Sequence, residues 1–306
     1  LLDGINLLEN NPIVMSEYKI NALAAKSILS RVYLYMENWD GVLRYTNEVL
    51  AEKSELTALA SADEAAFVWQ GSNAFGVYNM TTSNEVIWLY SNMGETSTFY
   101  TAGSFNYRAP FGVSDDLMDL YEFENDTEKK NFKDLRPFLY FSTSAYFLQG
   151  LPVYYQLYGC KCGKQSLTIG TKGIRTAELY LNRAEAYTRK FIALGDDNDR
   201  KLALADLNNL RRHRYDTRNV AYEPKDYRNG SDLLEFCKEE RRRELCFEDH
   251  RWFDLRRYGM PSFTHTYFIN TDNKEVITLT EEDPRYVLPI PKLALDRNPL
   301  LIQNKR

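Results

Sequence analysis

The densest run of charge in this sequence is Glu-Glu-Arg-Arg-Arg-Glu-Leu-Cys-Phe-Glu-Asp-His-Arg-Trp-Phe-Asp-Leu-Arg-Arg, residues 239–257. It holds six Arg and six acidic residues, which recur at steps of three and four, as on one face of a helix. Leu245, Phe247 and Trp252 are interleaved with them, so we expect part of the charge to be buried. Buried arginine–carboxylate pairs fix helix register rather than catalyse. We therefore interpret the stretch as architecture, with a structural ion-pair network of Glu240, Arg241, Arg242, Glu244, Glu248, Arg251 and Asp254.

Outside this stretch, apolar residues at helical spacing predict two pairs of helices. The first pair covers about 17–36 and 42–53, and the second covers 176–190 and about 199–211. Each pair is close in length to the tetratricopeptide unit of about 34 residues, but the pairs are not in tandem. A long helix, bent or straight, is expected from a cap at Ser231 to about Tyr258. Shorter helices are expected at 61–69 and 114–123.

The residues between the two pairs, 54–175, have a different pattern. We expect a short buried strand at 84–90 that includes Trp88, then a long loop at 91–112 and a hairpin at 137–158. A second hairpin is expected around 272–274, and the tail from Pro289 is expected to be extended. The predicted fold is mainly α: a tetratricopeptide-like scaffold of helical pairs with long irregular loops and short hairpin insertions. We expect one domain over 1–306, with a helix pair at 1–53, a loop-rich ligand-face insertion at 54–175, and helices and tail at 176–306.

The composition of the chain narrows the class of protein. The 306 residues are 44% hydrophobic and 14% aromatic, which excludes disordered and collagen-like chains. With 38 basic and 43 acidic residues, the net charge of −5 argues against a nucleic-acid partner. No run approaches the roughly 18 apolar residues of a membrane span, and the first residues do not form a signal peptide. Because the chain does not begin with Met, we interpret it as a fragment or a processed form.

Signatures of catalysis and of metal binding are weak. There is no Gly-x-Ser-x-Gly or His-Glu-x-x-His motif, and the Gly159–Lys164 run is one residue short of a phosphate loop. Cys237 and Cys246 are nine residues apart, on opposite sides of the predicted helix, so they are expected to be buried thiols. No catalytic residue, metal or cofactor is predicted. The sequence does not exclude a glycosidase with a pair of catalytic carboxylates, because acidic residues distant in sequence can converge in the fold.

Aromatic residues of the long loop are the best candidates for ligand contact. A loop has no core of its own to fill, and flat rings give a stiff, amphipathic surface suited to sugar rings or to peptide side chains. Their packing back onto the helices is an equally weighted alternative. By contrast, aromatic residues at helical spacing, such as Tyr180 and Tyr187, are expected to pack between helices. The predicted ligand-binding residues are Phe99, Tyr100, Phe105, Asn106, Tyr107 and Arg108.

Five ordered blocks resemble the C-terminal half of the SusD/RagB family. They are Thr176-Ala-Glu-Leu-Tyr-Leu-Asn-Arg-Ala-Glu-Ala186, Leu207-Asn-x-Leu-Arg211, Glu240-Arg-Arg-x-Glu-Leu-x-Phe-Glu-x-x-Arg-Trp-Phe-Asp-Leu255, Tyr286-Val-Leu-Pro-Ile-Pro291 and Asn298-Pro-x-Leu-x-Gln-Asn304. The helix pair near Ala24, Tyr35 and Trp39 is similar to an earlier pair of the family. Asp249 departs from the family pattern, where Gly is usual, and so do Leu293 and Ala294. The blocks form the scaffold, so the resemblance transfers no ligand residue.

The resemblance implies a non-catalytic surface lipoprotein of Bacteroidetes-type outer membranes. Such proteins capture glycans, or in some cases peptides, above a TonB-dependent transporter of the SusC type. It also implies that the chain lacks about the first third of a family member, including the lipid-bearing Cys. Attachment to the outer surface of the outer membrane is therefore expected only through a lipid anchor in that N-terminal third.

We expect a glycan-binding component of a polysaccharide uptake system, with an oligosaccharide or polysaccharide as ligand. The alternative is a tetratricopeptide-type module that binds a protein or peptide through Tyr180, Tyr187 or Arg183. A third possibility is a hydrolase, which requires turnover of a glycan.

Overall fold

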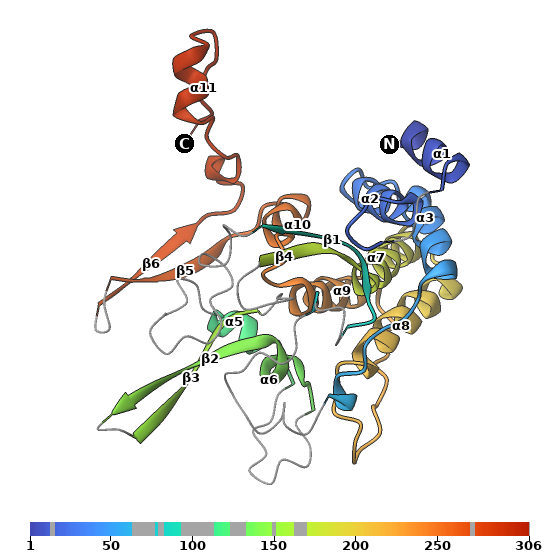
Figure 1. The fold of residues 1–306 in the computed structure, drawn as a ribbon, viewed down its shortest axis with the longest axis horizontal. Helices are drawn as coiled ribbons and strands as arrows, with labels where there is room; N and C mark the ends of the chain where they lie inside the picture. Colours follow the sequence, from blue (N-terminus) through green and yellow to red (C-terminus); the bar gives the residue numbers. More distant parts are fainter. Residues whose placement is uncertain are drawn as a thin grey trace. The chain divides into compact units, whose positions relative to one another are not determined.

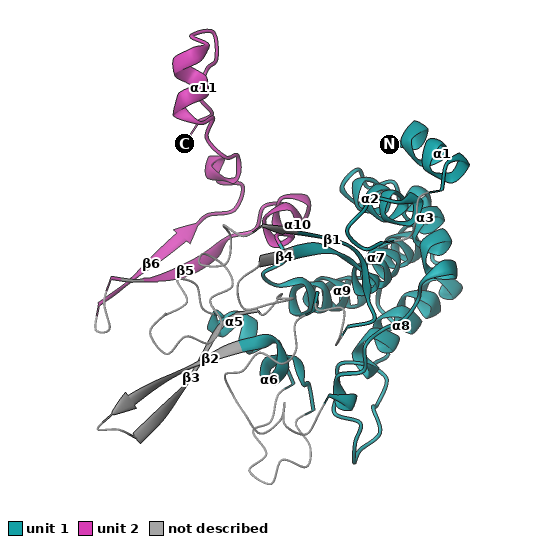
Figure 2. Ribbon diagram, in the orientation of Figure 1, with its two compact units in different colours: residues 1–248 teal, residues 249–306 magenta. Residues whose placement is uncertain are grey.

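The computed structural model describes residues 1–12, 16–62, 77–78, 83–92, 113–122, 133–148, 151–161, 170–269 and 273–305. Side chains are not described at 91–92, 142–148, 151–161, 170–171 and 268. The chain divides into two compact units, Leu1–Glu248 and Asp249–Arg306, which Figure 2 colours separately. The predicted partition of a single domain at residues 53 and 175 stays a prediction. No described helix is both long and apolar enough to cross a bilayer.

Six helices form the scaffold of the first unit. Helix α7 contacts α3, α8 and α9, and α2 contacts α1 and α3, so the two predicted pairs pack into one assembly (Figure 1). This confirms the mainly helical fold. The bounds are α1 (Leu2–Asn10), α2 (Ala22–Tyr35), α3 (Trp39–Glu52), α7 (Thr176–Leu194), α8 (Asp197–Arg212) and α9 (Gly230–Leu245).

Polar caps set where several of these helices begin. The side chain of Asn21 accepts a hydrogen bond from the amide of Ala24 at 2.9 Å, and Asn38 caps α3 in the same way. Helix α7 ends at Gly195, whose φ of 71° is a left-handed conformation that favours glycine. The expectation that Ser231 caps α9 is wrong, because the cap is Asn229, which accepts from the Ser231 amide at 2.8 Å.

The long helix predicted to reach Tyr258 is instead two helices. Helix α9 ends at Leu245, and α10 (Arg251–Arg257) begins six residues later. Between them Phe247 and Asp249 have φ values of 61° and 66°. A right-handed helix needs negative φ values, so the helix cannot continue through these residues. Asp249, where the resembling family usually has Gly, therefore occupies a left-handed position that glycine adopts without strain.

The described part of the insertion consists of short strands and short helices. Strand β1 (Val86–Asn92) pairs antiparallel with β4 (Gly170–Arg175), and β2 (Phe141–Leu148) with β3 (Leu151–Lys161). This confirms the predicted strand and first hairpin. The helix expected at 114–123 is only one turn, and most of the one expected at 61–69 lies outside the described residues. The short helices are η1 (Leu59–Ser61), α5 (Asp115–Met118) and α6 (Arg136–Tyr140).

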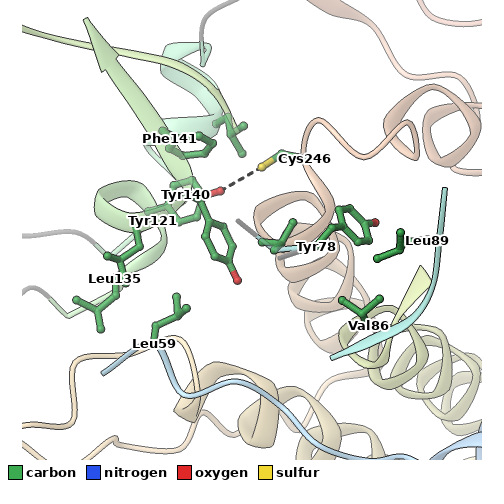
Figure 3. Close-up of a cluster of buried hydrophobic side chains, with 12 residues drawn as sticks. Leu59, Tyr78, Val86, Leu89, Tyr121, Leu135, Tyr140, Phe141 and Cys246 are labelled. Atoms are coloured by element: carbon green, nitrogen blue, oxygen red, sulfur yellow. Dashed lines mark hydrogen bonds between the residues drawn. The ribbon is translucent and has the colours of Figure 1, made fainter. Parts of the chain in front are cut away.

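Buried side chains of the insertion form a hydrophobic cluster of their own, the insertion cluster (Figure 3). Among the described buried members of this cluster, Cys246 is the one from outside residues 54–175, and Tyr121 Oη lies 3.6 Å from its Sγ. The larger clusters among the described helices lie between α7, α8 and α9 and between α2, α3, α7, β1 and β4, and smaller ones join α1, α2, α3 and α7. The members of the insertion cluster are Leu59, Val77, Tyr78, Val86, Leu89, Leu117, Tyr121, Leu135, Leu139, Tyr140, Phe141 and Cys246.

The second unit packs a hairpin against α10. Strands β5 (Phe263–Phe268) and β6 (Lys274–Leu279) pair antiparallel, which confirms the second predicted hairpin. Its small core holds Leu255, Leu279 and Tyr286, the last in η2 (Pro284–Tyr286). The tail is not simply extended as expected, because residues after Pro291 form α11 (Lys292–Arg297). Pro291 precedes the helix and lacks an amide donor, which costs nothing at that position.

Candidate functional site

The six predicted ligand-binding residues, Phe99, Tyr100, Phe105, Asn106, Tyr107 and Arg108, all lie outside the described residues. The structure does describe the two ends of their loop. Strand β1 carries Val86 and Leu89 of the insertion cluster before the loop, and Val113 packs against the same cluster after it. Both ends of the loop are thus attached to one buried cluster.

Beside this cluster lies a buried network of charged side chains, the central network. It joins five arginines to five carboxylates, all with side chains at most 5% exposed. Equal numbers of opposite charges, each hydrogen-bonded, offset the cost of removing the ions from water. Its members are Arg136, Arg175, Arg211, Arg214 and Arg243 with Glu85, Asp134, Glu240, Glu244 and Glu248.

Glu244 on α9 is the hub of the central network. Its carboxylate accepts from Arg175 Nη1 at 2.6 Å, Arg136 Nη1 at 3.1 Å, and Arg214 Nε and Nη2 at 3.0 Å each. Tyr140 Oη donates at 3.4 Å. These donors come from α6, β4 and the chain after α8, so one side chain links three parts of the fold.

The other glutamates extend the network on both sides. Glu240 accepts from Arg136 at 2.6 Å and Arg211 at 2.7 Å. Glu85, just before β1, accepts from Arg214 at 2.7 Å and Arg175 at 3.0 Å. The insertion and the scaffold are therefore joined by charge-assisted hydrogen bonds in addition to apolar packing.

The pKa of Glu240 shows which effect dominates in the network, burial or the neighbouring positive charges. Burial disfavours the ionised carboxylate, but the guanidinium groups of Arg136, Arg243 and Arg211 outweigh burial and hold the pKa of Glu240 well below its usual range. A general acid needs a raised pKa, so Glu240 is unsuited to donate a proton near neutral pH.

The sequence located the acids of the network better than their partners. Of the three neighbouring arginines, Arg243 bonds Glu240 at 2.9 Å, whereas Arg241 donates to Asn182 at 2.8 Å and Arg242 is half-buried with a pKa lowered by burial. The main partners, Arg136, Arg175, Arg211 and Arg214, come from other elements. Arg136 and Arg175 each stand alone at the end of an apolar segment, and Arg211 and Arg214 belong to the run Arg-Arg-His-Arg, so no spacing in the sequence links them to the glutamates.

The last two predicted network residues, Arg251 and Asp254, belong to the second unit. There Asp254 accepts a hydrogen bond from Arg257 Nε at 2.9 Å, within the same short helix. The predicted network is thus divided between two units, because the helix expected to carry all of it ends at Leu245.

Residues of the alternative peptide-binding prediction are engaged between helices. Arg183 forms two hydrogen bonds to Asp206, at 2.8 and 2.7 Å, and a third to Asn47 at 2.8 Å. Tyr180 Oη donates to the Ser54 carbonyl at 3.0 Å, and Tyr187 packs against the α7–α9 cluster. These contacts tie α3, α7 and α8 together. They explain the positions of the three side chains as helix packing, with no ligand required.

Metal-ligating and reactive groups are scarce in the described part of the chain. It contains no group of three Cys, His, Asp or Glu side chains able to hold an ion. Cys237 is buried against Thr188 Oγ1 at 3.2 Å, and burial raises the pKa of its thiol to about 12. At neutral pH this thiol stays protonated and unreactive.

Comparison with known proteins gives a consistent result. The model of the SusD family, SusD_RagB, matches residues 68–306. The chain is similar to a SusD-like carbohydrate binding protein from Bacteroides vulgatus (21% identity, TM-score 0.61, 98% of this chain and 64% of that chain). It is also similar to a SusD superfamily protein from Bacteroides thetaiotaomicron (23%, 0.63, 100% and 65%) and to a laminarin binding SusD-like protein (19%, 0.53, 99% and 67%). The chain thus spans about two thirds of the length of these proteins. No curated protein matches the sequence significantly.

Proposed function

Because the chain belongs to the SusD family, we propose that it is a non-catalytic, cell-surface glycan-binding component of a polysaccharide uptake system. The family match over residues 68–306 is the observation that carries this proposal. Similar solved structures include a carbohydrate binding protein and a laminarin binding protein, which supports a glycan as the ligand.

The arrangement of the described residues suits a binding protein better than a hydrolase. The densest cluster of carboxylates is saturated by arginines and sealed from solvent, so it leaves no acid poised beside a substrate. The residues before and after the predicted loop at 91–112 are attached to one buried cluster, through Val86 and Leu89 on one side and Val113 on the other. We assign ligand contact to that loop, through Phe99, Tyr100, Phe105, Asn106, Tyr107 and Arg108, since stacked rings and side-chain donors recognise sugars.

The proposal is tested by affinity electrophoresis and isothermal titration with laminarin, pullulan, xyloglucan, mannan and arabinogalactan. At least one polysaccharide is expected to retard the protein, with no reducing sugar released over hours. Tyr100→Ala and Tyr107→Ala are expected to weaken binding about tenfold or more, because each removes a stacking ring. Release of reducing ends would instead make the protein a hydrolase, and unchanged binding by both variants would remove the loop from the site.

The same proposal includes partnership with a TonB-dependent transporter at the outer surface of the outer membrane. Co-expression of the protein with a SusC-type transporter from the same organism tests this step. The two proteins are expected to co-purify from detergent-solubilised outer membranes. Recovery of the protein only in the periplasmic fraction would contradict both the partnership and the location.

A further inference from the structure

Strand β1 turns two aromatic side chains to the same face near its end. The pairing of β1 with β4 shifts register between Val86 and Trp88, as in a β-bulge. As a result Leu89 belongs to the insertion cluster, whereas Ile87 and Trp88 pack against the helices. Tyr90, two residues beyond Trp88, shares the face of Trp88.

This aromatic pair extends from a packed region into solvent. The ring centroids of Trp88 and Tyr90 are 5.4 Å apart with their planes tilted by 36°. Trp88 is half-buried at the edge of the helical cluster, contrary to the expectation of a buried residue, and Tyr90 is 45% exposed. The half-buried Lys172 lies directly across from Tyr90 on β4.

A further segment of the first unit borders the same strand. The amide of Leu89 donates to the carbonyl of Glu17 at 2.7 Å, which brings residues 16–20 alongside β1. Within that segment Tyr18 is 51% exposed and Ile20 is 47% exposed. Trp88, Tyr90 and Lys172 together form what we call the strand-end patch, and residues 16–20 run beside its strand.

We propose that the strand-end patch is a glycan subsite at which a sugar ring lies against Tyr90 and the exposed part of Trp88. Two tilted rings offer apolar surface to the C–H face of a pyranose, and the Lys172 ammonium, across from Tyr90 on β4, supplies a polar contact to its hydroxyl groups. The inference rests on the proposed function and extends its ligand face onto a rigid strand.

The path of the chain argues for a glycan as the occupant. Strand β1 leads directly into the segment assigned to ligand contact, and the seven steps of the chain from Asn92 to Phe99 span at most about 25 Å. One oligosaccharide can therefore reach both places. A strand anchored by β4 and by residue 17 also holds its rings in place before the ligand arrives, which lowers the entropic cost of binding.

The test compares Tyr90→Ala, Trp88→Phe and Tyr267→Ala against whichever of laminarin, pullulan, xyloglucan, mannan and arabinogalactan the wild type binds. Tyr267, 59% exposed on the hairpin of the second unit, is the matched control. Tyr90→Ala is expected to weaken binding by about threefold to tenfold, as loss of one aromatic stacking partner does. Trp88→Phe keeps a ring and is expected to retain binding while reducing the tryptophan fluorescence change caused by the glycan. Tyr267→Ala is expected to bind as the wild type does.

The outcomes separate this inference from the function on which it rests. Wild-type affinity for Tyr90→Ala, with binding lost in Tyr100→Ala, overturns the subsite and leaves the proposed function intact. A wild type that binds none of the five polysaccharides overturns the function and the subsite with it. If Tyr90→Ala instead changes the oligomeric state measured by light scattering, a second copy of the chain covers the patch and the subsite is wrong.

Discussion

The central network and the C-terminal tail, the residues from Pro289 onward, both depart from the usual distribution of residue types, the network by burying charged side chains and the tail by exposing apolar ones. The network buries ten charged side chains, among them Glu244 and Arg214, both fully buried. The tail exposes large aliphatic side chains, with Leu300 and Ile302 each 87% exposed. Whether a side chain is buried therefore depends on the partners that the fold offers it and not on its residue type alone. Every charged side chain of the network contacts one of opposite charge, whereas helix α11 of the tail buries none of its residues.

The two regions also differ in how they are held. The network joins segments far apart in sequence, such as Glu85 and Arg214, which lie 129 residues apart. The tail closes on itself through side-chain amides. Gln303 accepts from the Ile290 amide at 2.8 Å and donates to its carbonyl at 2.9 Å, and Asn304 donates to the Leu288 carbonyl at 2.7 Å. Loss of a contact is therefore expected to have a global effect in the network and a local effect in the tail.

The largest effect is expected for Glu244→Ala. This change leaves Arg136, Arg175 and Arg214 buried without their shared carboxylate, and breaking a buried ion pair typically costs about 3 to 5 kcal/mol. Urea denaturation followed by circular dichroism measures the free energy of unfolding. Glu275→Ala, at an exposed position on β6, is the matched control and is expected to change stability by less than about 0.5 kcal/mol. Equal stabilities of the two variants would show that the network is not what joins the insertion to the scaffold.

An intermediate effect is expected from acid. The pKa of Glu240 is depressed in the folded protein, so its contribution to stability is complete above its unfolded pKa of about 4.3 and is lost as the pH falls toward the folded value. Each proton bound on unfolding changes the free energy of unfolding by about 1.4 kcal/mol per pH unit. Glu240→Gln is expected to be less stable at neutral pH and to lose stability less steeply below about pH 4. Parallel curves for the variant and the wild type would contradict the assignment.

The smallest effect is expected for Gln303→Ala in the tail. An exposed hydrogen bond contributes little net stability, so the free energy of unfolding is expected to change by less than about 1 kcal/mol. Hydrogen exchange of the Ile290 amide, which donates to Gln303, is expected to become faster. Lys305→Ala, next to the amide contacts but not part of them, serves as the control. A global loss of stability in Gln303→Ala would remove the contrast between tail and network.

Local signals in the sequence predicted much of the fold. The periodicity around Leu29 and Leu181 acts within one or two helical turns, so it can be recognised without knowing the rest of the chain. The hairpin around Gly150 was found for the same reason. Two errors concerned the ends of one helix. Asn229 and not Ser231 caps its beginning, and residues in the left-handed conformation follow its end, where a continuous helix was expected.

For the candidate site, too, one part was predicted from the sequence and another depended on the three-dimensional structure. Aromatic composition alone selected the loop of Tyr100 and Tyr107, and it stays a prediction because those residues lie outside the described part of the chain. The packing of both Ile87 and Trp88 against the helices depends on the bulge in β1, which moves the side chains after Val86 from one side of the strand to the other. No period-2 pattern in the sequence marks such a bulge.

By itself the sequence determined the two helix pairs, both hairpins and the presence of an arginine–glutamate stretch at the end of the scaffold, because the spacing of apolar residues and the chemistry of turns are short-range effects. Only the tertiary structure decided which arginines meet those glutamates and which aromatic rings reach solvent. An ion pair in a protein interior depends on distance in space, and Arg136 and Glu240, 104 residues apart in the chain, lie 2.6 Å apart only after the insertion has folded onto the helices.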